Sequence, residues 1–319
     1  MASANLVFRH GERTSHHNLT CALEPVPTLA AHEVLVEVRG VTLNYRDLAI
    51  SNGTYPFPVK DNVVPCSDSA GVVAAVGDAV EDISVGDRVV ANFDRSNLYD
   101  HRRTGSTRSA VSSTARFVST LQCSHRGRED PETCELSFTQ LALSSAPASR
   151  LDALFGCIPL QPGQTVLFLG TGGVSITGLQ LAKAAGAVTI ITSSSDEKLQ
   201  FVKDNFGVDH VINYRKTPDW AAEANRITHG RARLHHRDAQ EDMPDVASMV
   251  LDKGCIVRGV VVGSKQLLED VIRFVSNKNI QPYIHKTLGF SREGVLEAFD
   301  LLKSARHIGK IGIEVASKK

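Results

Sequence analysis

The sequence predicts an α/β protein built on a doubly wound parallel sheet, with a small β-barrel in front of it. From residue 162 onward, apolar runs typical of buried strands alternate with helical segments. This alternation indicates parallel strands joined by helices. In the first third of the chain, short β-rich runs are separated by glycine and aspartate, which is typical of a small barrel.

The length and composition indicate a two-domain globular chain. It has 319 residues, and single cores rarely grow beyond about 300 residues. Hydrophobic residues make up 42% and charged residues 22%, the balance of a folded protein in water. The formal net charge is zero, so nucleic acid and membrane partners are not expected. No apolar run approaches about 18 residues, and no apolar signal core lies near residue 1, so we expect a cytoplasmic protein.

The barrel region is expected to contain strands at residues 33–41, 70–77 and 86–91, where apolar residues alternate or cluster between turn residues. Residues 95–150 differ, because they are rich in Ser, Thr, Arg and His and lack sustained apolar faces. This composition indicates either a mobile loop or a segment whose sequence suits its fold poorly.

The second half shows a regular alternation of elements. We expect strands at 165–169, 187–192 and 210–213, helices at 174–185, 196–206, 265–277 and 291–304, a β-rich run at 255–262 and a last strand at 309–315. Residues 231–240 are charged where a fourth apolar strand is expected. Because a strand–helix–strand unit takes about 30 residues, the parallel sheet is expected to be shortened, with exposed edges.

A glycine-rich turn lies between the first expected strand of this half and the helix that follows. It consists of Gly170, Thr171, Gly172, Gly173, Val174 and Ser175. The pattern matches the dinucleotide-binding motif G-x-G-x-x-G, with a serine in place of the last glycine. The glycines allow a tight turn and close approach of a pyrophosphate, and the helix N-terminus offers unpaired N–H groups. We predict that the residues from Gly170 to Val174 bind a dinucleotide; the alternative is a plain loop at a helix start.

The end of the second expected strand favours NADPH over NADH. NAD-binding proteins usually place Asp or Glu there to accept from the ribose hydroxyl. Here Ser193 and Ser194 follow the strand, and Lys198 comes a few residues later. Hydroxyls and a cation suit a 2′-phosphate, which a carboxylate would repel. The alternative for Lys198 is a solvated helix residue.

These motifs and their surroundings resemble the medium-chain dehydrogenase/reductase superfamily. Residues 161–167 resemble the family's lead into its first Rossmann strand, and residues 211–215 resemble the end of its third strand. Residues 85–89 resemble a turn of its GroES-like barrel. Residues 43–47 and 65–71 are similar to the quinone-reductase branch.

The resemblance implies a GroES-like catalytic domain over 1–150, a Rossmann NADP-binding domain over 151–284 and a return to the catalytic domain over 285–319. The active site is then expected in the cleft between the domains. Residues matching Lys198 and Tyr214 contact the adenosine 2′-phosphate region in related reductases. The resemblance also implies a homodimer formed through Rossmann edge strands.

The zinc ligands of the related alcohol dehydrogenases are not expected here. Those enzymes use a cysteine near the position of Asn44 and a Gly-His-Glu near Ser67 and Asp68. Catalytic zinc needs three protein ligands, which this stretch of sequence does not supply, so we expect no metal. The pairs His16-His17 and His235-His236 are adjacent. Neighbours on regular structure point in different directions, so we expect surface histidines.

Without zinc, a simple alcohol is a poor substrate, whereas a quinone or an α,β-unsaturated carbonyl needs only hydrogen-bond donors and a proton after hydride addition. Asn44 and Tyr55 are the candidates for catalysis. Residues 53–56 resemble the segment that carries the catalytic tyrosine of enoyl reductases, although a packed loop aromatic is the alternative. Tyr45 is expected to form a cleft wall, and Asp47 to be a structural hydrogen-bond acceptor.

The leading hypothesis is therefore an NADPH-dependent quinone or enoyl reductase acting on a small molecule, with a possible place in secondary metabolism. A second hypothesis is a degenerate, catalytically impaired relative that binds NADPH or a partner without turnover, because residues 95–150 and 231–240 depart from the family pattern. A third is an alcohol dehydrogenase-type activity, which the missing ligands disfavour.

Overall fold

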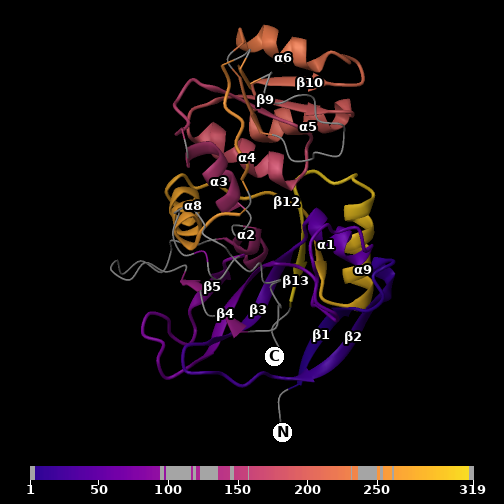
Figure 1. Cartoon of the computed structure of the whole chain (residues 1–319), viewed down its shortest axis with the longest axis vertical. Helices are drawn as coiled ribbons and strands as arrows, with labels where there is room; N and C mark the ends of the chain where they lie inside the picture. The colour runs from indigo at the N-terminus through magenta and orange to yellow at the C-terminus, as the bar shows by residue number, and fades with distance from the viewer. Residues whose placement is uncertain are drawn as a thin grey trace.

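The computed structural model describes residues 4–93, 97, 116–117, 120–122, 136–143, 147–156, 158–230, 232–235, 250–251, 254–260 and 262–315. Figure 1 shows two bodies of elements along the long axis, one built on an antiparallel-rich sheet and the other on a parallel sheet. None of the helices in the described ranges is long and apolar enough to cross a membrane.

The lower body in Figure 1 holds a seven-stranded sheet with the order β12-β13-β3-β4-β5-β7, with β6 paired to β3. Its strands are β3 (Val34–Thr42), β4 (Asp68–Val76), β5 (Arg88–Ala91), β6 (Arg116–Phe117), β7 (Thr120–Gln122), β12 (Ile284–Gly289) and β13 (Lys310–Glu314). The expected strands at 33–41, 70–77, 86–91 and 309–315 are thus confirmed within a few residues. The first two strands carry apolar side chains into a shared core that includes Val36 and Val73.

Short elements beside this sheet were not expected from the sequence. They are the hairpin β1 (Ala4–His10) and β2 (Leu19–Pro25), the 3₁₀ turn η1 (His16–Asn18), α1 (Tyr45–Ser51), α2 (Phe138–Leu143) and α3 (Pro147–Phe155). α2 lies inside the segment 95–150 and α3 begins in it, so part of that segment is helical. It is also packed, because Leu141, Ala142 and Leu143 are fully buried. Most other residues of the segment 95–150, expected to be a mobile loop or poorly suited to the fold, lie outside the described ranges.

The upper body contains a parallel sheet with the order β10-β9-β8-β11. Its strands are β8 (Thr165–Phe168), β9 (Val188–Ser193), β10 (His210–Asn213) and β11 (Ala232–His235), with α4 (Gly173–Ala184), α5 (Asp196–Phe206) and α6 (Trp220–Thr228) between them. The alternation predicted from residue 162 is confirmed. The apolar run of β8 is buried on both faces, as Val166, Leu167 and Phe168 show.

Two expectations for the later part of this body are wrong. The charged stretch after residue 230 does form a fourth strand, because β11 pairs in parallel with β8 from Ala232↔Thr165 to His235↔Phe168. Backbone hydrogen bonds do not require apolar side chains, so an edge strand tolerates charge. Conversely, the β-rich run at 255–262 forms no strand over its described residues, and Ile256 and Val257 are 67% and 65% exposed.

Local sequence explains where the helices begin and end. The Ser195 hydroxyl accepts from the Lys198 amide at the start of α5, and Gly207 ends it in the left-handed region at φ 59°. Ser264 and Ser291 cap α8 (Lys265–Asn277) and α9 (Arg292–Lys303) in the same way as Ser195. The expected helices at 265–277 and 291–304 are confirmed.

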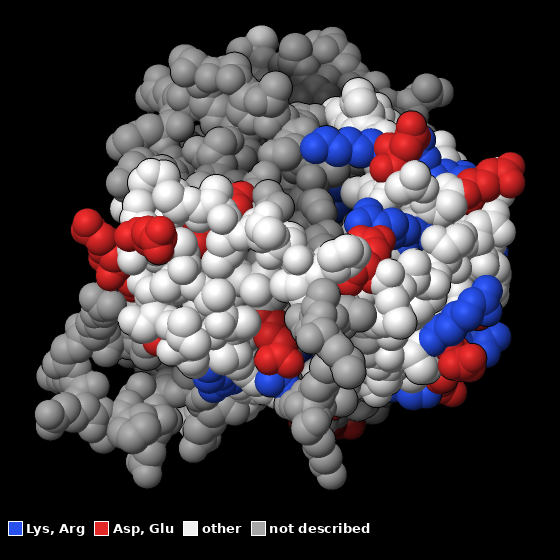
Figure 2. Space-filling view, turned by 90° about the horizontal axis from the view of Figure 1, so that it is seen from below, with Lys and Arg blue, Asp and Glu red and all other residues white. Residues whose placement is uncertain are grey.

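The chain returns to the lower body after α8. β12, α9 and β13, yellow in Figure 1, lie among the indigo N-terminal elements, and β13 pairs antiparallel with β3. On this pairing we propose the domain limits 1–150, 151–284 and 285–319. Figure 2 shows Lys and Arg interspersed with Asp and Glu over the described part of one face, in keeping with the zero net charge.

Candidate active site

The glycine-rich turn has the geometry of a phosphate-binding loop. Gly170 has φ 73°, in the left-handed region, and Gly172 is the N-cap of α4 without a side-chain capping bond. A Cβ placed on either glycine would meet no atom within 4 Å, so open space lies in front of the backbone. Ser175 donates from its hydroxyl to the Leu169 carbonyl at 2.7 Å, which explains how serine replaces the motif's last glycine. A dinucleotide pyrophosphate therefore fits here.

The start of β13 lies against this turn. The Gly309 amide donates to the Thr171 carbonyl at 2.9 Å, and Gly172 and Gly309 form an isolated parallel bridge. A Cβ on Gly173 would lie only 2.6 Å from Cγ of Lys310. Gly173 is thus required by the aliphatic stem of a lysine, whereas Gly172 faces open space.

The Lys310 ammonium reaches from this turn into the lower body. Its Nζ donates to the Leu43 carbonyl at 3.1 Å and to the Asn44 amide oxygen, and lies 3.2 Å from Oδ2 of Asp68. Asn44 donates from Nδ2 to the same Asp68 oxygen at 2.8 Å. We call Lys310, Asn44 and Asp68 the Lys310 cluster. The side chains of Lys310 and Asp68 are 4% and 3% exposed, so this is a buried ion pair.

The Asp68 carboxylate remains ionised in this buried place. Burial alone raises its pKa, but the Lys310 ammonium and hydrogen bonds from Asn44, Lys310 and Ser67 outweigh burial and lower the pKa below its usual range. The Ser67 hydroxyl supplies one of these bonds at 3.0 Å. The cluster is therefore a charged, hydrogen-bonded unit at the junction of β13, β4 and the N-terminus of α1.

Asp47 holds the loop that carries Asn44. Its carboxylate accepts from the backbone N–H of Asn44 at 2.7 Å and from the backbone N–H of Cys66 at 3.2 Å. Burial raises the pKa of Asp47 to about 6, although Arg46 nearby opposes this. Asp47 is a structural acceptor, as the sequence predicted.

Tyr55 lies outside the described hydrogen-bond network of the Lys310 cluster. Its ring contacts Phe57 edge-on, with 5.5 Å between centroids, and the Arg46 guanidinium lies 5.3 Å from its centroid. Within the described ranges, no hydrogen bond joins Tyr55 to Asn44 or Lys310. The structure does not bring the two predicted catalytic residues together through bonds, and Tyr45 is 55% exposed.

Of the residues predicted to read the 2′-phosphate, the structure joins Ser193 to Tyr214 at the end of β9, whereas Lys198 faces the C-terminal segment. Ser193 is buried, and its carbonyl accepts from the Tyr214 amide at 3.1 Å. Ser194 is half-buried beside it. The Lys198 ammonium donates to the Ala305 and His307 carbonyls at 2.7 and 3.2 Å, and burial lowers its pKa. Val174 is half-buried in the first turn of α4.

A hollow of about 460 Å³ lies beside Lys198, and we call it the Lys198 hollow. It is lined by Ser195, Glu197, Lys198, Phe201, Ala305, Arg306 and Ile308. Arg306 adds a second cation, which no sequence motif indicated. Lys310 and Arg306 were missed because they lie more than a hundred residues from the residues they join. The available signal was a lysine at the start of an otherwise apolar last strand.

In the part of the chain that the structure describes, no group of three metal-ligating atoms forms around Asp68. Among the described residues, the group of three that could hold a metal ion is His16, His17 and Asp300, on η1 and α9. The expectation that the two adjacent histidines diverge is wrong: both Nε2 atoms face Oδ1 of Asp300, and His16 is fully buried. A single 3₁₀ turn does not impose the side-chain directions of longer regular structure. His236 lies outside the described residues.

Comparisons with known proteins match this architecture. A family model described as "Alcohol dehydrogenase GroES-like domain" matches residues 30–127, and one described as "Zinc-binding dehydrogenase" matches residues 173–257. A zinc-type alcohol dehydrogenase-like protein of Schizosaccharomyces pombe is 35% identical over an alignment of 325 residues, gaps included, that covers 89% of this chain and 91% of that protein.

Solved structures show the same fold. A candidate alcohol dehydrogenase from Sinorhizobium meliloti aligns with a TM-score of 0.78 at 28% identity, over 98% of this chain and 99% of that one. The Escherichia coli quinone oxidoreductase, solved in complex with NADPH, aligns with a TM-score of 0.75 at 20% identity, over 97% and 100%. The predicted combination of a GroES-like domain and a Rossmann domain is confirmed.

Proposed function

The chain belongs to the medium-chain dehydrogenase/reductase superfamily of oxidoreductases, and we propose that it transfers hydride from NADPH to a quinone or an α,β-unsaturated carbonyl. The observation that carries this proposal is the Lys310 cluster, which orients an asparagine amide beside the glycine-rich turn. Bound NADPH supplies the hydride.

Counting donors assigns the roles within the cluster. An ammonium has three N–H donors, and the oxygens of Leu43, Asn44 and Asp68 can accept all three from Lys310. It is therefore a positioning residue. An amide has two N–H donors, and Asn44 directs one of them to Asp68. The second is available for the oxygen on which charge develops after hydride addition.

The cluster also fixes which way the Asn44 amide points. Its oxygen faces an ammonium and its nitrogen faces a carboxylate. The flipped amide would place NH₂ against NH₃⁺ and oxygen against a carboxylate, which loses two charge-assisted bonds. Asn44 is thereby preorganised as a donor. Tyr55 is proposed as the proton donor from the neighbouring half-buried loop.

The remaining residues are proposed to hold NADPH. The amides from Gly170 to Val174 would bind the pyrophosphate at the N-terminus of α4. Ser193, Ser194, Tyr214, Lys198 and Arg306 would surround the 2′-phosphate. The Lys198 hollow supports this with two cations, Lys198 and Arg306, against the single carboxylate of Glu197.

The experiment is NADPH oxidation measured with a panel of quinones and enones, on protein shown to be folded. We expect turnover with at least one class, a loss of about 100-fold in kcat for Asn44→Ala, and a smaller loss for Tyr55→Phe. Full activity of Asn44→Ala would overturn the proposed donor, and unchanged turnover of Tyr55→Phe on every acceptor would remove Tyr55 from the chemistry.

A second candidate is a relative that binds NADPH without turnover. The parallel sheet has four strands in the described residues, and the segment 255–260 leaves apolar side chains exposed. NADPH binding without oxidation by any acceptor would favour it. An alcohol dehydrogenase-type activity would show instead as NADP⁺ reduction by simple alcohols. We further propose a cytoplasmic homodimer, which light scattering and localisation of the tagged chain test.

A further inference from the structure

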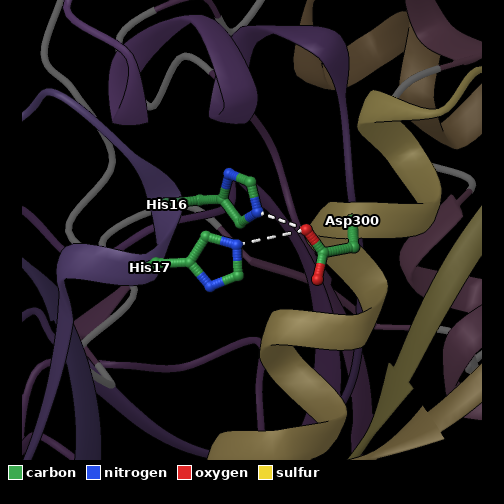
Figure 3. A group of neighbouring side chains, drawn as sticks. All are labelled: His16, His17 and Asp300. Atoms are coloured by element: carbon green, nitrogen blue, oxygen red, sulfur yellow. Dashed lines mark hydrogen bonds and ion pairs between the residues drawn. The ribbon is translucent and has the colours of Figure 1, made fainter.

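A cluster of metal-ligating side chains lies outside the proposed active site. His16 and His17 form η1, and Asp300 lies on α9 (Figure 3). The Nε2 atoms of His16 and His17 lie 2.8 and 3.3 Å from Oδ1 of Asp300. The three ligand atoms lie within 4.8 Å of one another. Segments nearly 300 residues apart in sequence thus converge on one point.

The local fold fixes the direction of the buried ring. Ser15 caps the turn by accepting from the His17 amide at 3.2 Å. The His16 ring stacks on Phe299 with 5.7 Å between centroids and 11° between planes, and its side chain is fully buried. His17 and Asp300 are 55% and 54% exposed. One ligand is therefore preorganised, while two can adjust at the surface.

We propose that His16, His17 and Asp300 bind one late first-row divalent transition metal ion, of which Zn²⁺ is the best fit. Two imidazole nitrogens and a carboxylate oxygen are a ligand set that such ions accept, with water completing the coordination. In a tetrahedral site with bonds of about 2.1 Å the ligand atoms lie about 3.4 Å apart. The present separations, 2.8 and 3.3 Å to Asp300 and at most 4.8 Å overall, therefore need adjustments of about 1.4 Å or less, which the two exposed side chains can make.

One feature of the site limits its affinity. Nδ1 of His16 is buried without a hydrogen-bond partner. When Nε2 binds a metal, the ring proton resides on Nδ1, where a second-shell acceptor normally holds it. Because that acceptor is absent from the described surroundings of His16, binding in the micromolar range is expected rather than the tight binding of structural zinc. The proposal revises the sequence-based expectation of a metal-free chain.

The alternative is a hydrogen-bonded clamp without metal. In it, both histidines donate a proton to Asp300, and the interaction only ties η1 to α9. A clamp and a metal site respond differently to Asp300→Asn, because the amide oxygen still accepts both hydrogen bonds but is a poor zinc ligand.

The test is Zn²⁺ titration of the full-length, chelator-treated protein, with competition against a chromophoric chelator. Co²⁺ absorption reports ligand geometry as a second probe. The variants are His17→Gln and Asp300→Asn, which alter exposed side chains, and the matched control is His32→Gln, another exposed histidine. Thermal unfolding with and without Zn²⁺ checks that each variant is folded.

We expect one Zn²⁺ per chain, about tenfold or more weaker binding in His17→Gln and Asp300→Asn, and unchanged binding in His32→Gln. Saturating Zn²⁺ should raise the Tm of the native protein by about 3 °C or more and that of Asp300→Asn much less. No binding, or equal binding in His17→Gln through the exposed thiols Cys21 and Cys255, would overturn the proposal. None of these readouts depends on oxidoreductase activity.

Discussion

The Lys310 cluster and the Lys198 hollow both lie where the C-terminal segment meets the parallel-sheet body, but they are built in opposite ways. The Lys310 cluster is buried, and its Asp68 carboxylate accepts from both the Lys310 ammonium and the Asn44 amide nitrogen. The second is open, with Arg306 and Glu197 exposed at its rim. A closed charged cluster positions a neighbour, whereas an open cationic hollow is suited to receive an anion.

The largest expected effect comes from breaking the closed cluster. Lys310→Met leaves the Asp68 carboxylate buried and unpaired, which should cost about 3–5 kcal/mol of unfolding free energy. Denaturant unfolding measures it. The double variant Lys310→Met/Asp68→Asn should recover most of the loss, and Lys286→Met, which breaks an exposed pair with Glu297, should cost under about 1 kcal/mol. Equal losses of unfolding free energy in Lys310→Met and Lys286→Met would show that the buried ion pair contributes no more to stability than the exposed one.

A second prediction concerns His10, a buried titratable group packed against α1. His10 is 3% exposed, and burial, helped by Arg13 and Arg46, lowers its pKa to about 4. Between about pH 6.5 and pH 4 the unfolded state takes up the proton and the folded state does not, so stability falls as pH falls through this window.

The comparison with His10→Asn isolates this effect, because it subtracts the opposite contribution of Asp47, whose pKa is raised. The native protein should lose up to about 3 kcal/mol relative to the variant between pH 6.5 and pH 4. Parallel pH profiles of the two proteins would contradict the assignment.

Substitutions in the Lys198 hollow should change coenzyme binding rather than protein stability. Lys198→Ala and Arg306→Ala should each weaken NADPH binding by about tenfold, or about 1.4 kcal/mol, while NADH binding changes little. Fluorescence titration of both coenzymes measures this. Lys203→Ala, on the exposed face of the same helix, is the matched control. If NADH binding fell equally, the hollow would not be a 2′-phosphate site.

The smallest stability effect is expected at Gly172, and it contrasts with its neighbour. Gly172→Ala adds a Cβ into open space, so unfolding free energy should change by less than about 1 kcal/mol, although dinucleotide binding weakens. Gly173→Ala places its Cβ against the Lys310 stem and should destabilise the protein more. The reverse order in thermal unfolding would mean that the stem is free to move aside.

Sequence patterns located the parallel sheet well because their information is local. The boundaries of α5, β10 and α8 matched the expected ones residue for residue, since a serine cap, a glycine end and apolar periodicity all lie within a few residues. Short elements such as α1 and β11 were not predicted, because seven and four residues give too little periodicity and edge pairing tolerates charge.

The sequence by itself determined the glycine-rich turn, the serines after β9 and the missing zinc ligands, because each is a matter of residue type at short spacing. Only the tertiary structure decided that Lys310 reaches Asn44 and Asp68, that Arg306 joins Lys198, and that His16 and His17 meet Asp300. These contacts depend on β13 and α9 packing back onto the first residues of the chain, and long-range packing has no period that can be read along a sequence.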